Sequence, residues 1–230
     1  MKGLVIVVAG AGGPAGRAVT RRLAEAGATV VAADADKERL DAALSAAPEG
    51  VEGEVIDLLD LDAVRGWAGR VEERHGRVDG VIHLVGGWRG ASSFAETDLG
   101  DWALLHDLLV RTLQHTTLAF EGAIKRSENS RFAIVSAQAA AKPTENNACY
   151  ATAKVAAETW MLAFADALRG TESAAVTLVV KALVDDAMRA AKPEAKFLGF
   201  TDVADLAEAV AGLWKKPAAD LNGARVDLTT

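Results

Sequence analysis

The chain has 230 residues, half of them apolar and a quarter charged, so it has ample material for a buried core, and intrinsic disorder is excluded. Its net charge of -7 comes without a block of Lys and Arg, which argues against nucleic-acid and membrane partners. The single cysteine, Cys149, excludes an intrachain disulfide and a cysteine-rich metal site, and it favours a cytoplasmic location.

Short β-branched runs alternate with longer segments of helical period, which is typical of βαβ units in a parallel sheet. The first run, residues 4–9, is too short for a signal peptide or a membrane span and is expected to be a strand. Strands are predicted at residues 4–9, 29–33, 54–57, 80–85, 132–135, 176–180 and 224–228. Helices are predicted at residues 15–26, 37–46, 61–74, 99–125, 148–169 and 203–214.

This order predicts a single doubly wound α/β Rossmann domain over residues 1–230, with a seven-stranded, mostly parallel sheet and helices on both faces. Two stretches, residues 140–147 and 182–200, are expected to be irregular, and each follows the carboxyl end of a strand. Ligands of open α/β sheets bind at that edge. We therefore expect the domain to carry its own substrate site there.

A glycine-rich turn follows the first strand and opens directly into a helix, with the sequence Gly10, Ala11, Gly12, Gly13, Pro14, Ala15, Gly16. Glycines let the backbone approach a pyrophosphate, whose charge is met by free N–H groups and the positive end of the helix. Pro14 suits a first helical turn because no intrahelical partner is needed there. The alternative is a strand-to-helix connection that binds no ligand.

Asp34 ends the second predicted strand, where a dinucleotide fold places its ribose-binding acid. Its carboxylate can accept hydrogen bonds from both adenosine ribose hydroxyls, and its charge would repel a 2′-phosphate. We therefore expect NAD(H) to be favoured as cofactor, while Lys37 and Arg39 nearby keep NADP(H) open. The alternative role for Asp34 is a turn or cap residue.

Tyr150 and Lys154 lie four residues apart on a predicted helix, so both side chains project from one face. An ammonium beside a phenol favours the phenolate, which would bring the pKa of Tyr150 into a useful range for proton transfer. We hypothesise that Tyr150 exchanges a proton with a carbonyl or hydroxyl oxygen while a hydride passes between substrate and nicotinamide. The alternative is a surface pair without a function.

Together these features resemble the short-chain dehydrogenase/reductase family over nearly the whole chain. The resemblance also rests on the sequences Asp57-Leu58, His83-Leu84-Val85-Gly86 and Tyr150-Ala151-Thr152-Ala153-Lys154. It implies an NAD(P)-dependent oxidoreductase in which Asp57 and Leu58 flank the adenine. It further implies that Val85 and Gly86 pass beside the cofactor ribose and that Lys154 holds the nicotinamide ribose.

Several positions depart from the family pattern. The catalytic serine, thirteen residues before the tyrosine, is Ala137 here, and the adjacent Ser136 is the candidate replacement, although neighbouring strand residues point to opposite faces. The remaining departures are Ala9 and Pro14 in the glycine turn, Arg111 at the family asparagine, and Lys181-Ala182 at the Pro-Gly after the sixth strand. Ala137, Arg111 and Lys181 favour the alternative function, a non-catalytic dinucleotide-binding sensor or scaffold, whereas the intact Tyr150–Lys154 pair favours the enzyme.

Gly86-Gly87-Trp88 and the C-terminal stretch, residues 200–230, are similar to the dihydropteridine reductase branch of the family, which keeps the Tyr and Lys without the serine. This similarity implies a quinonoid substrate, which is already electrophilic, with Trp88 stacked on its ring. The alternative is that Trp88 packs a loop.

The remaining polar candidates give weaker signals. The histidines show no metal-ligand spacing, so no metal is expected at His75, His83, His106 and His115. Cys149 lacks a partnering base and is expected to pack, whereas Lys181 could attract an anionic substrate or be a solvated loop residue. The resemblance implies a small-molecule substrate and a homodimer or homotetramer paired through the helices predicted at residues 99–125 and 148–169.

Overall fold

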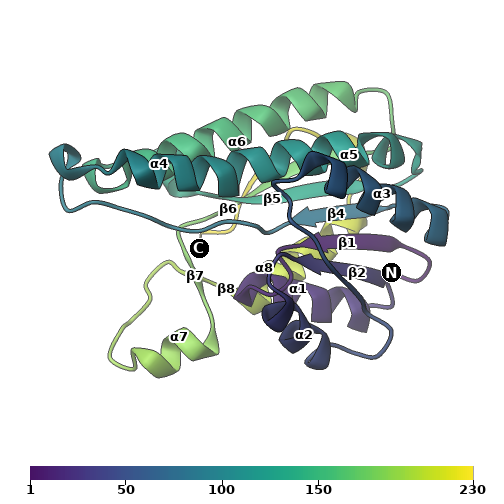
Figure 1. Ribbon diagram of the computed structural model, residues 1–230, viewed down its shortest axis with the longest axis horizontal. Helices are drawn as coiled ribbons and strands as arrows, with labels where there is room; N and C mark the ends of the chain where they lie inside the picture. The colour runs from purple at the N-terminus through teal and green to yellow at the C-terminus, as the bar shows by residue number, and fades with distance from the viewer. Residues whose placement is uncertain (230) are drawn as a thin grey trace.

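The computed structural model describes residues 1–229, and Thr230 lies outside that range. Within it, seven parallel strands form one sheet in the order β3-β2-β1-β4-β5-β6-β9 (Figure 1). The strands are β1 (Val5–Ala9), β2 (Thr29–Asp34), β3 (Glu52–Val55), β4 (Gly80–His83), β5 (Arg131–Ala137), β6 (Ala174–Val180) and β9 (Arg225–Asp227). The predicted doubly wound Rossmann fold is confirmed, and its strand order reverses between β1 and β4.

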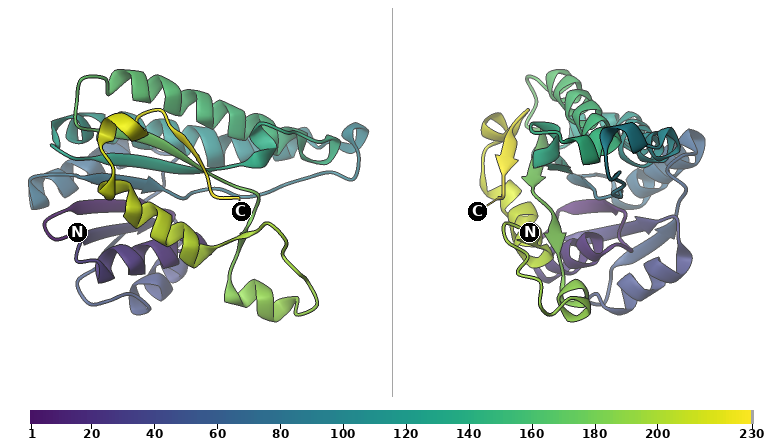
Figure 2. Two further views of the ribbon diagram at one scale, coloured as in Figure 1. Left: turned by 180° about the vertical axis from the view of Figure 1, so that it is seen from behind. Right: turned by 90° about the vertical axis from the view of Figure 1, so that its left-hand side faces the viewer.

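Helices cover both faces of this sheet (Figures 1 and 2). One face carries α1 (Pro14–Glu25), α2 (Lys37–Ser45) and α8 (Val203–Gly212), with the short α9 (Ala218–Leu221) near β6. The other carries α3 (Leu61–His75), α5 (Thr112–Arg126) and α6 (Ala148–Ala167), while α4 (Leu99–His106) packs on α6. Short 3₁₀ turns lie at Phe94–Glu96, Gln138–Ala140, Glu145–Asn147 and Leu213–Lys215.

The β1 strand shows why a continuous apolar run predicts a central strand. Val5 and Val7 point into the core under α3 and α5, whereas Ile6 and Val8 point into the core under α1 and α8. All four side chains are buried because β1 lies between β2 and β4 and is covered on both faces.

Several predicted strand boundaries are wrong by two residues: both ends of β3, the end of β4, the end of β5 and the start of β6. Strand β3 lies two residues earlier than expected because it pairs only with β2, and that ladder ends where Asp34 meets Val55. The chain then turns, with the carboxylate of Asp57 accepting a hydrogen bond from the Leu59 backbone N–H at 2.9 Å. Strand β4 ends at His83, because the neighbouring chain turns away at Gly10, which has a φ of 81°.

The helix predicted over residues 99–125 is interrupted. A π-helical turn, Asp107–Arg111, separates α4 from α5. Immediately after it, the Thr112 hydroxyl donates to the Leu108 carbonyl at 2.7 Å. Single π-helical turns inside long helices are frequently found at functional sites, and this one lies beside the cavity described below.

Residues 182–200 are more ordered than expected. They contain β7 (Leu183–Val184) and α7 (Asp186–Ala191), and β7 pairs in parallel with β8 (Thr201–Asp202). An ion pair between Arg189 and Asp202 at 2.9 Å ties α7 to the end of this ladder. Figure 1 shows that α7 projects away from the sheet on the side of its strand ends. None of the helices in the described range has the length and hydropathy needed to span a bilayer.

Candidate active site

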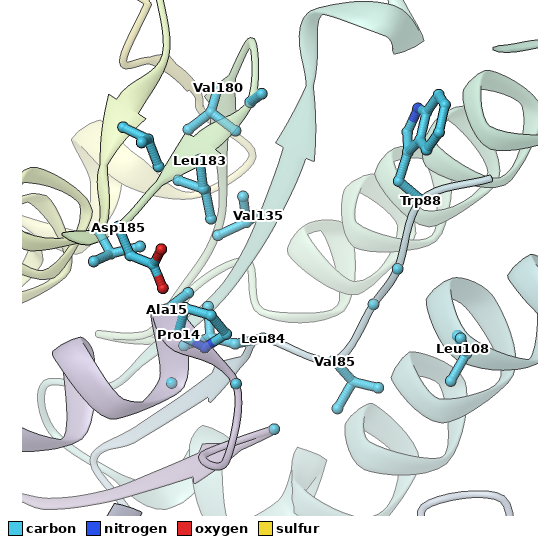
Figure 3. A pocket seen from close by; sticks show the side chains of 18 of the residues that line it. Pro14, Ala15, Leu84, Val85, Trp88, Leu108, Val135, Val180, Leu183 and Asp185 are labelled. Atoms are coloured by element: carbon cyan, nitrogen blue, oxygen red, sulfur yellow. The ribbon is translucent and has the colours of Figure 1, made fainter. Parts of the chain in front are cut away.

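An open cavity of about 1440 Å³ lies at the carboxyl ends of the central strands (Figure 3). In Figure 3, Trp88 lies on one side of it and Leu183 and Asp185 on the other, with Pro14 and Ala15 next to Asp185. Twelve of the predicted site residues line this cavity: Gly10, Gly13, Ala15, Gly16, Asp34, Asp57, Leu58, Val85, Gly86, Ser136, Tyr150 and Lys154. The fold therefore brings the predicted cofactor-binding and catalytic residues to one place.

The glycine turn is built so that its backbone closes tightly below the cavity. A Cβ atom on Gly16 would lie 2.1 Å from the Gly10 carbonyl oxygen, and one on Gly10 would lie 2.9 Å from the Leu84 backbone. Ala15 and Gly16 belong to the first turn of α1, where backbone N–H groups have no intrahelical acceptor. These donors and the positive helix end fit an anionic phosphate group.

Asp34 is fixed at the end of β2 by two backbone donors, Gly12 N–H at 2.9 Å and Asp36 N–H at 3.1 Å. Gly12 itself does not line the cavity but holds this carboxylate. Arg39 also packs against Gly12 and lines the cavity, whereas Lys37 is paired with Asp41 at 2.6 Å. The carboxylate of Asp34 and the guanidinium of Arg39 thus lie close together in the part of the cavity beside Gly12.

Four further predicted residues form the side walls. Asp57 and Leu58 follow β3, and Leu58 is held from behind by a hydrogen bond between its carbonyl oxygen and Nδ1 of His115 at 2.9 Å. Val85 and Gly86 follow β4, where a Cβ on Gly86 would lie 2.8 Å from the side chain of Leu109. The walls are thus apolar surfaces flanked by one carboxylate.

Tyr150 and Lys154 share one face of α6, as expected, with the Lys154 ammonium 5.7 Å from the centre of the Tyr150 ring. The ammonium donates to the Val135 carbonyl oxygen at 2.7 Å, which anchors it to the end of β5. Burial lowers the pKa of the Lys154 ammonium to about 8, and the nearby carboxylate of Glu158 opposes this shift.

The expectation that the pKa of Tyr150 is lowered is wrong for the protein without bound cofactor or substrate. Burial raises the pKa of the Tyr150 phenol to about 12, because the phenolate would lose solvation. The Lys154 ammonium lies over the ring rather than being hydrogen-bonded to the hydroxyl, and its described hydrogen bond goes to Val135. Tyr150 is therefore a protonated phenol at neutral pH, suited to donating a proton.

Ser136, the candidate replacement for the missing serine, does line the cavity. Its hydroxyl, however, donates to Oε1 of Glu158 at 2.5 Å. A hydroxyl has one hydrogen to donate, so in this arrangement Ser136 has none for a substrate oxygen. Ala137, at the usual serine position, is buried and offers no hydrogen-bonding side chain.

Two polar residues of the cavity wall, Thr112 just after the π-helical turn and His83 at the end of β4, were not predicted as site residues. Thr112 and His83 both line the cavity, and their side chains are joined at 3.2 Å between Oγ1 and Nε2. Because Thr112 donates to Leu108, its oxygen accepts a hydrogen bond from His83 Nε2–H. Arg111, at the family asparagine, instead pairs with Asp107 at 3.4 Å. A π-helical turn that brings Thr112 into the site leaves no simple signal in the sequence.

Lys181 and Trp88 take different roles. The Lys181 ammonium donates to the Leu198 carbonyl oxygen at 2.8 Å and lies over the Phe200 ring, so it joins the two ends of the segment 182–200.

Trp88 is 63% exposed and lines the cavity. The edge of its indole packs against Gly90, where a Cβ would lie 2.6 Å from the ring. Trp88 thus keeps a large aromatic surface available at the cavity mouth.

The family model of the short chain dehydrogenases matches residues 4–196. The chain therefore belongs to the short chain dehydrogenase family. Among curated relatives, meso-2,3-butanediol dehydrogenase of Serratia marcescens is 38% identical over 99 residues, which cover 43% of this chain and 39% of that protein. The probable oxidoreductase EphD of Mycobacterium tuberculosis is 29% identical over 188 residues, which cover 79% of this chain and 31% of that protein. The matched stretches thus span less than two fifths of each relative.

Solved structures share the fold over nearly the whole chain. An NAD+-bound xylitol dehydrogenase has a TM-score of 0.87 at 22% identity, covering 99% of this chain and 98% of that one. An NADPH-bound short chain oxidoreductase from Pseudomonas aeruginosa, described as containing an atypical catalytic center, has a TM-score of 0.86 at 22% identity, covering 97% and 94%. At these identities the likeness establishes the Rossmann architecture.

Proposed function

We propose that the protein is an NAD(P)-dependent oxidoreductase that transfers a hydride to or from a carbonyl or quinonoid substrate, with Tyr150 as the acid or base. One observation carries the proposal: the glycine turn, Asp34 and the Tyr150–Lys154 pair all line one cavity. The turn has no room for side chains at Gly10 and Gly16. Glycines at such positions let the backbone approach a bound diphosphate closely. These residues fit a nicotinamide dinucleotide.

We expect NAD(H) to be favoured, with NADP(H) also accepted. The Asp34 carboxylate is held in place to accept hydrogen bonds from ribose hydroxyls. Arg39 lines the same part of the cavity and, among the residues described, has no carboxylate within salt-bridge distance. Its guanidinium could therefore pair with a 2′-phosphate.

In the mechanism, a bound nicotinamide would supply or accept the hydride. Tyr150 holds a proton on its phenol at neutral pH and delivers it to the substrate oxygen as the substrate carbon is reduced. Lys154, fixed to the Val135 carbonyl oxygen, places a positive charge beside that phenol, which favours the phenolate left behind. For oxidation of an alcohol, Tyr150 takes the proton in the reverse direction.

The quinonoid part of the proposal is supported by the substrate side of the cavity. Ala137 offers no hydroxyl and Ser136 gives its hydrogen to Glu158, so polarisation of a simple ketone is weak here. An electrophilic ring needs less polarisation, and the exposed Trp88 offers a surface on which a flat ring can stack.

The test is oxidation of NADH and NADPH by the purified protein, measured against a panel of quinonoid pterins, quinones and ketones. We expect turnover with at least one class, and a loss of about a hundredfold or more in Tyr150→Phe with cofactor binding nearly unchanged. Trp88→Ala should raise KM for ring substrates. Full activity in Tyr150→Phe would remove Tyr150 from the mechanism.

The second candidate is a non-catalytic dinucleotide-binding sensor or scaffold. It is favoured by the same departures, Ala137 at the serine position and Arg111 turned away to Asp107. Clear dinucleotide binding without turnover across the whole panel would select this function over the enzyme.

A further inference from the structure

Three charged or polar side chains from separate elements meet on the sheet side of α6. Ser136 of β5 donates to Oε1 of Glu158 on α6 at 2.5 Å, and Arg225 of β9 contacts Oε2 of Glu158 at 3.2 Å. Ser136 is 1% exposed, and 20% of the Glu158 side chain is exposed. The carboxylate of Glu158 is thus held from two sides in a largely buried position.

Glu158 lies one helical turn beyond Lys154, which itself lies one turn beyond Tyr150, so the three residues form one stripe along α6. The Lys154 ammonium is bonded to the carbonyl of Val135, the residue next to Ser136 in β5. The same strand end therefore fixes both the ammonium and, through Ser136, the carboxylate behind it. Either group would lose its hydrogen bond if it moved away from this end of β5.

The other titratable groups around Lys154 do not supply a negative charge. His83 on β4 is buried, and burial lowers its pKa to about 3, so it is neutral at physiological pH. The phenol of Tyr150 is also neutral, because burial raises its pKa to about 12. Arg225, on β9, faces Glu158 and is itself a cation. Among the described residues, Glu158 is the carboxylate whose charge favours the protonated form of Lys154.

We propose that Glu158, held by Ser136 and Arg225, is a positioning residue for Lys154: its fixed carboxylate lies one turn along α6 from the ammonium, and both groups are anchored to neighbouring residues of β5. The inference rests on the proposed function and adds a residue to its machinery. It also gives Ser136 a role other than polarising a substrate: it orients the carboxylate that supports the lysine. The alternative is that the Ser136–Glu158–Arg225 contacts only join β9 to α6.

A substitution that removes the charge but keeps the shape separates these two roles. Glu158→Gln retains the volume of the side chain and can still bond to Ser136, whereas it loses the negative charge. Asp166→Asn is the matched control, because it removes a carboxylate from the same helix at an exposed position paired with Arg169. Glu158→Asp keeps the charge and should rescue the effect in part.

The first readout is the pH profile of kcat/KM in the reductive direction. Because wild-type Lys154 loses its proton near pH 8, activity should fall above that pH. In Glu158→Gln the lysine should lose its proton at a lower pH, so activity at pH 8 should fall about tenfold while activity at pH 6 stays within about twofold. Asp166→Asn should keep the wild-type profile. A uniform loss at every pH would indicate a merely structural contact and overturn the proposal.

The second readout does not depend on turnover. NMR titration of protein labelled at its lysine side chains, with Lys154 assigned by Lys154→Arg, measures the lysine pKa without cofactor or substrate. We expect a lower Lys154 pKa in Glu158→Gln, and a smaller decrease in Ser136→Ala. An unchanged Lys154 pKa in Glu158→Gln would overturn the inference, whereas absence of turnover in the wild type with a shifted pKa would contradict only the proposed function.

Discussion

Asp34 and Arg39 both pack against the backbone of Gly12 and line the cavity, with opposite charges. Their proximity gives a prediction about cofactor choice. Asp34→Ala should weaken NADH binding about tenfold, more than it weakens NADPH binding, since it removes an acceptor for ribose hydroxyls. Arg39→Ala should weaken NADPH more than NADH, because it removes a cation for the 2′-phosphate.

Calorimetric titration with each cofactor measures both effects. Lys37→Ala is the matched control, because Lys37 is an exposed cation on the same helix that is already paired with Asp41. It should leave both affinities unchanged. Equal losses for the two cofactors in Asp34→Ala would contradict the assignment of this carboxylate to the ribose.

His83 gives a prediction about stability and pH. Burial lowers its pKa from 6.5 to about 3, so at acidic pH the unfolded chain binds a proton that the folded protein does not. The free energy of unfolding should therefore fall as the pH drops from 6.5 towards 3. From pH 7 to pH 5, the titration of His83 should lower the free energy of unfolding by about 2 kcal/mol.

The comparison variant is His83→Asn, which retains a side-chain donor for Thr112 but does not titrate. Urea unfolding at pH 7 and pH 5 should show a smaller loss in this variant than in the wild type, by the same amount. A parallel decrease in both proteins would mean that His83 is protonated within the fold.

For single residues, the sequence predicted where the side chains lie better than it predicted their protonation states and hydrogen-bond partners. The placement of Asp34, Tyr150 and Lys154 at one cavity follows from the order of the strands and from helical spacing. The raised pKa of Tyr150 and the bond from Ser136 to Glu158 depend on burial and on a partner 22 residues away, and no local pattern encodes either.

The turn between β1 and α1 shows how an element constrains its residues. Gly16→Ala would bring a methyl group within 2.1 Å of the Gly10 carbonyl oxygen, so the turn must shift to accept it. We expect a loss of about 1 to 3 kcal/mol in the free energy of unfolding and a large loss of dinucleotide affinity. Thermal unfolding and calorimetry measure the two effects.

Gly69→Ala is the matched control. Gly69 lies within α3 and has no atom within 4 Å of an added Cβ, so alanine should stabilise the helix by about 0.5 to 1 kcal/mol and leave cofactor binding unchanged. Wild-type affinity in Gly16→Ala would show that the tight closure of this turn is not needed for binding.

Strands that are buried on both faces could be predicted from the sequence, as the continuous apolar run of β1 shows. The boundaries that failed depend on partners far along the chain. Strand β3 ends where β2 stops pairing with it, and β4 ends where Gly10 turns its neighbour away. The order within residues 182–200 comes from pairing between β7 and β8, two short strands whose local sequence carries little signal.

The outer faces of α5 and α6 give a prediction for the whole molecule. Leu118, Val155 and Leu162 are each 45 to 58% exposed, and Val155 and Leu162 lie seven residues apart, on one side of α6. Figure 1 shows α5 and α6 side by side on the same face of the sheet. We propose that this apolar face pairs two copies of the chain, as part of a homodimer or homotetramer.

Light scattering during size-exclusion chromatography measures this directly. The wild type should elute as an oligomer, and the double variant Val155→Asp with Leu162→Asp should elute as a smaller species that remains folded. Met188→Asp, a change at an exposed apolar residue on α7, should leave the mass unchanged. A monomeric wild type would contradict the proposed pairing.

The central claim is that the cavity at the strand ends holds a nicotinamide dinucleotide. Isothermal titration of the purified protein with NADH and NADPH tests it most directly, with Gly16→Ala as the variant whose turn must shift to accept a methyl group. We predict saturable binding at one site per chain, tighter for NADH and strongly weakened in the variant. If neither dinucleotide binds the wild-type protein, both the oxidoreductase and the sensor are contradicted.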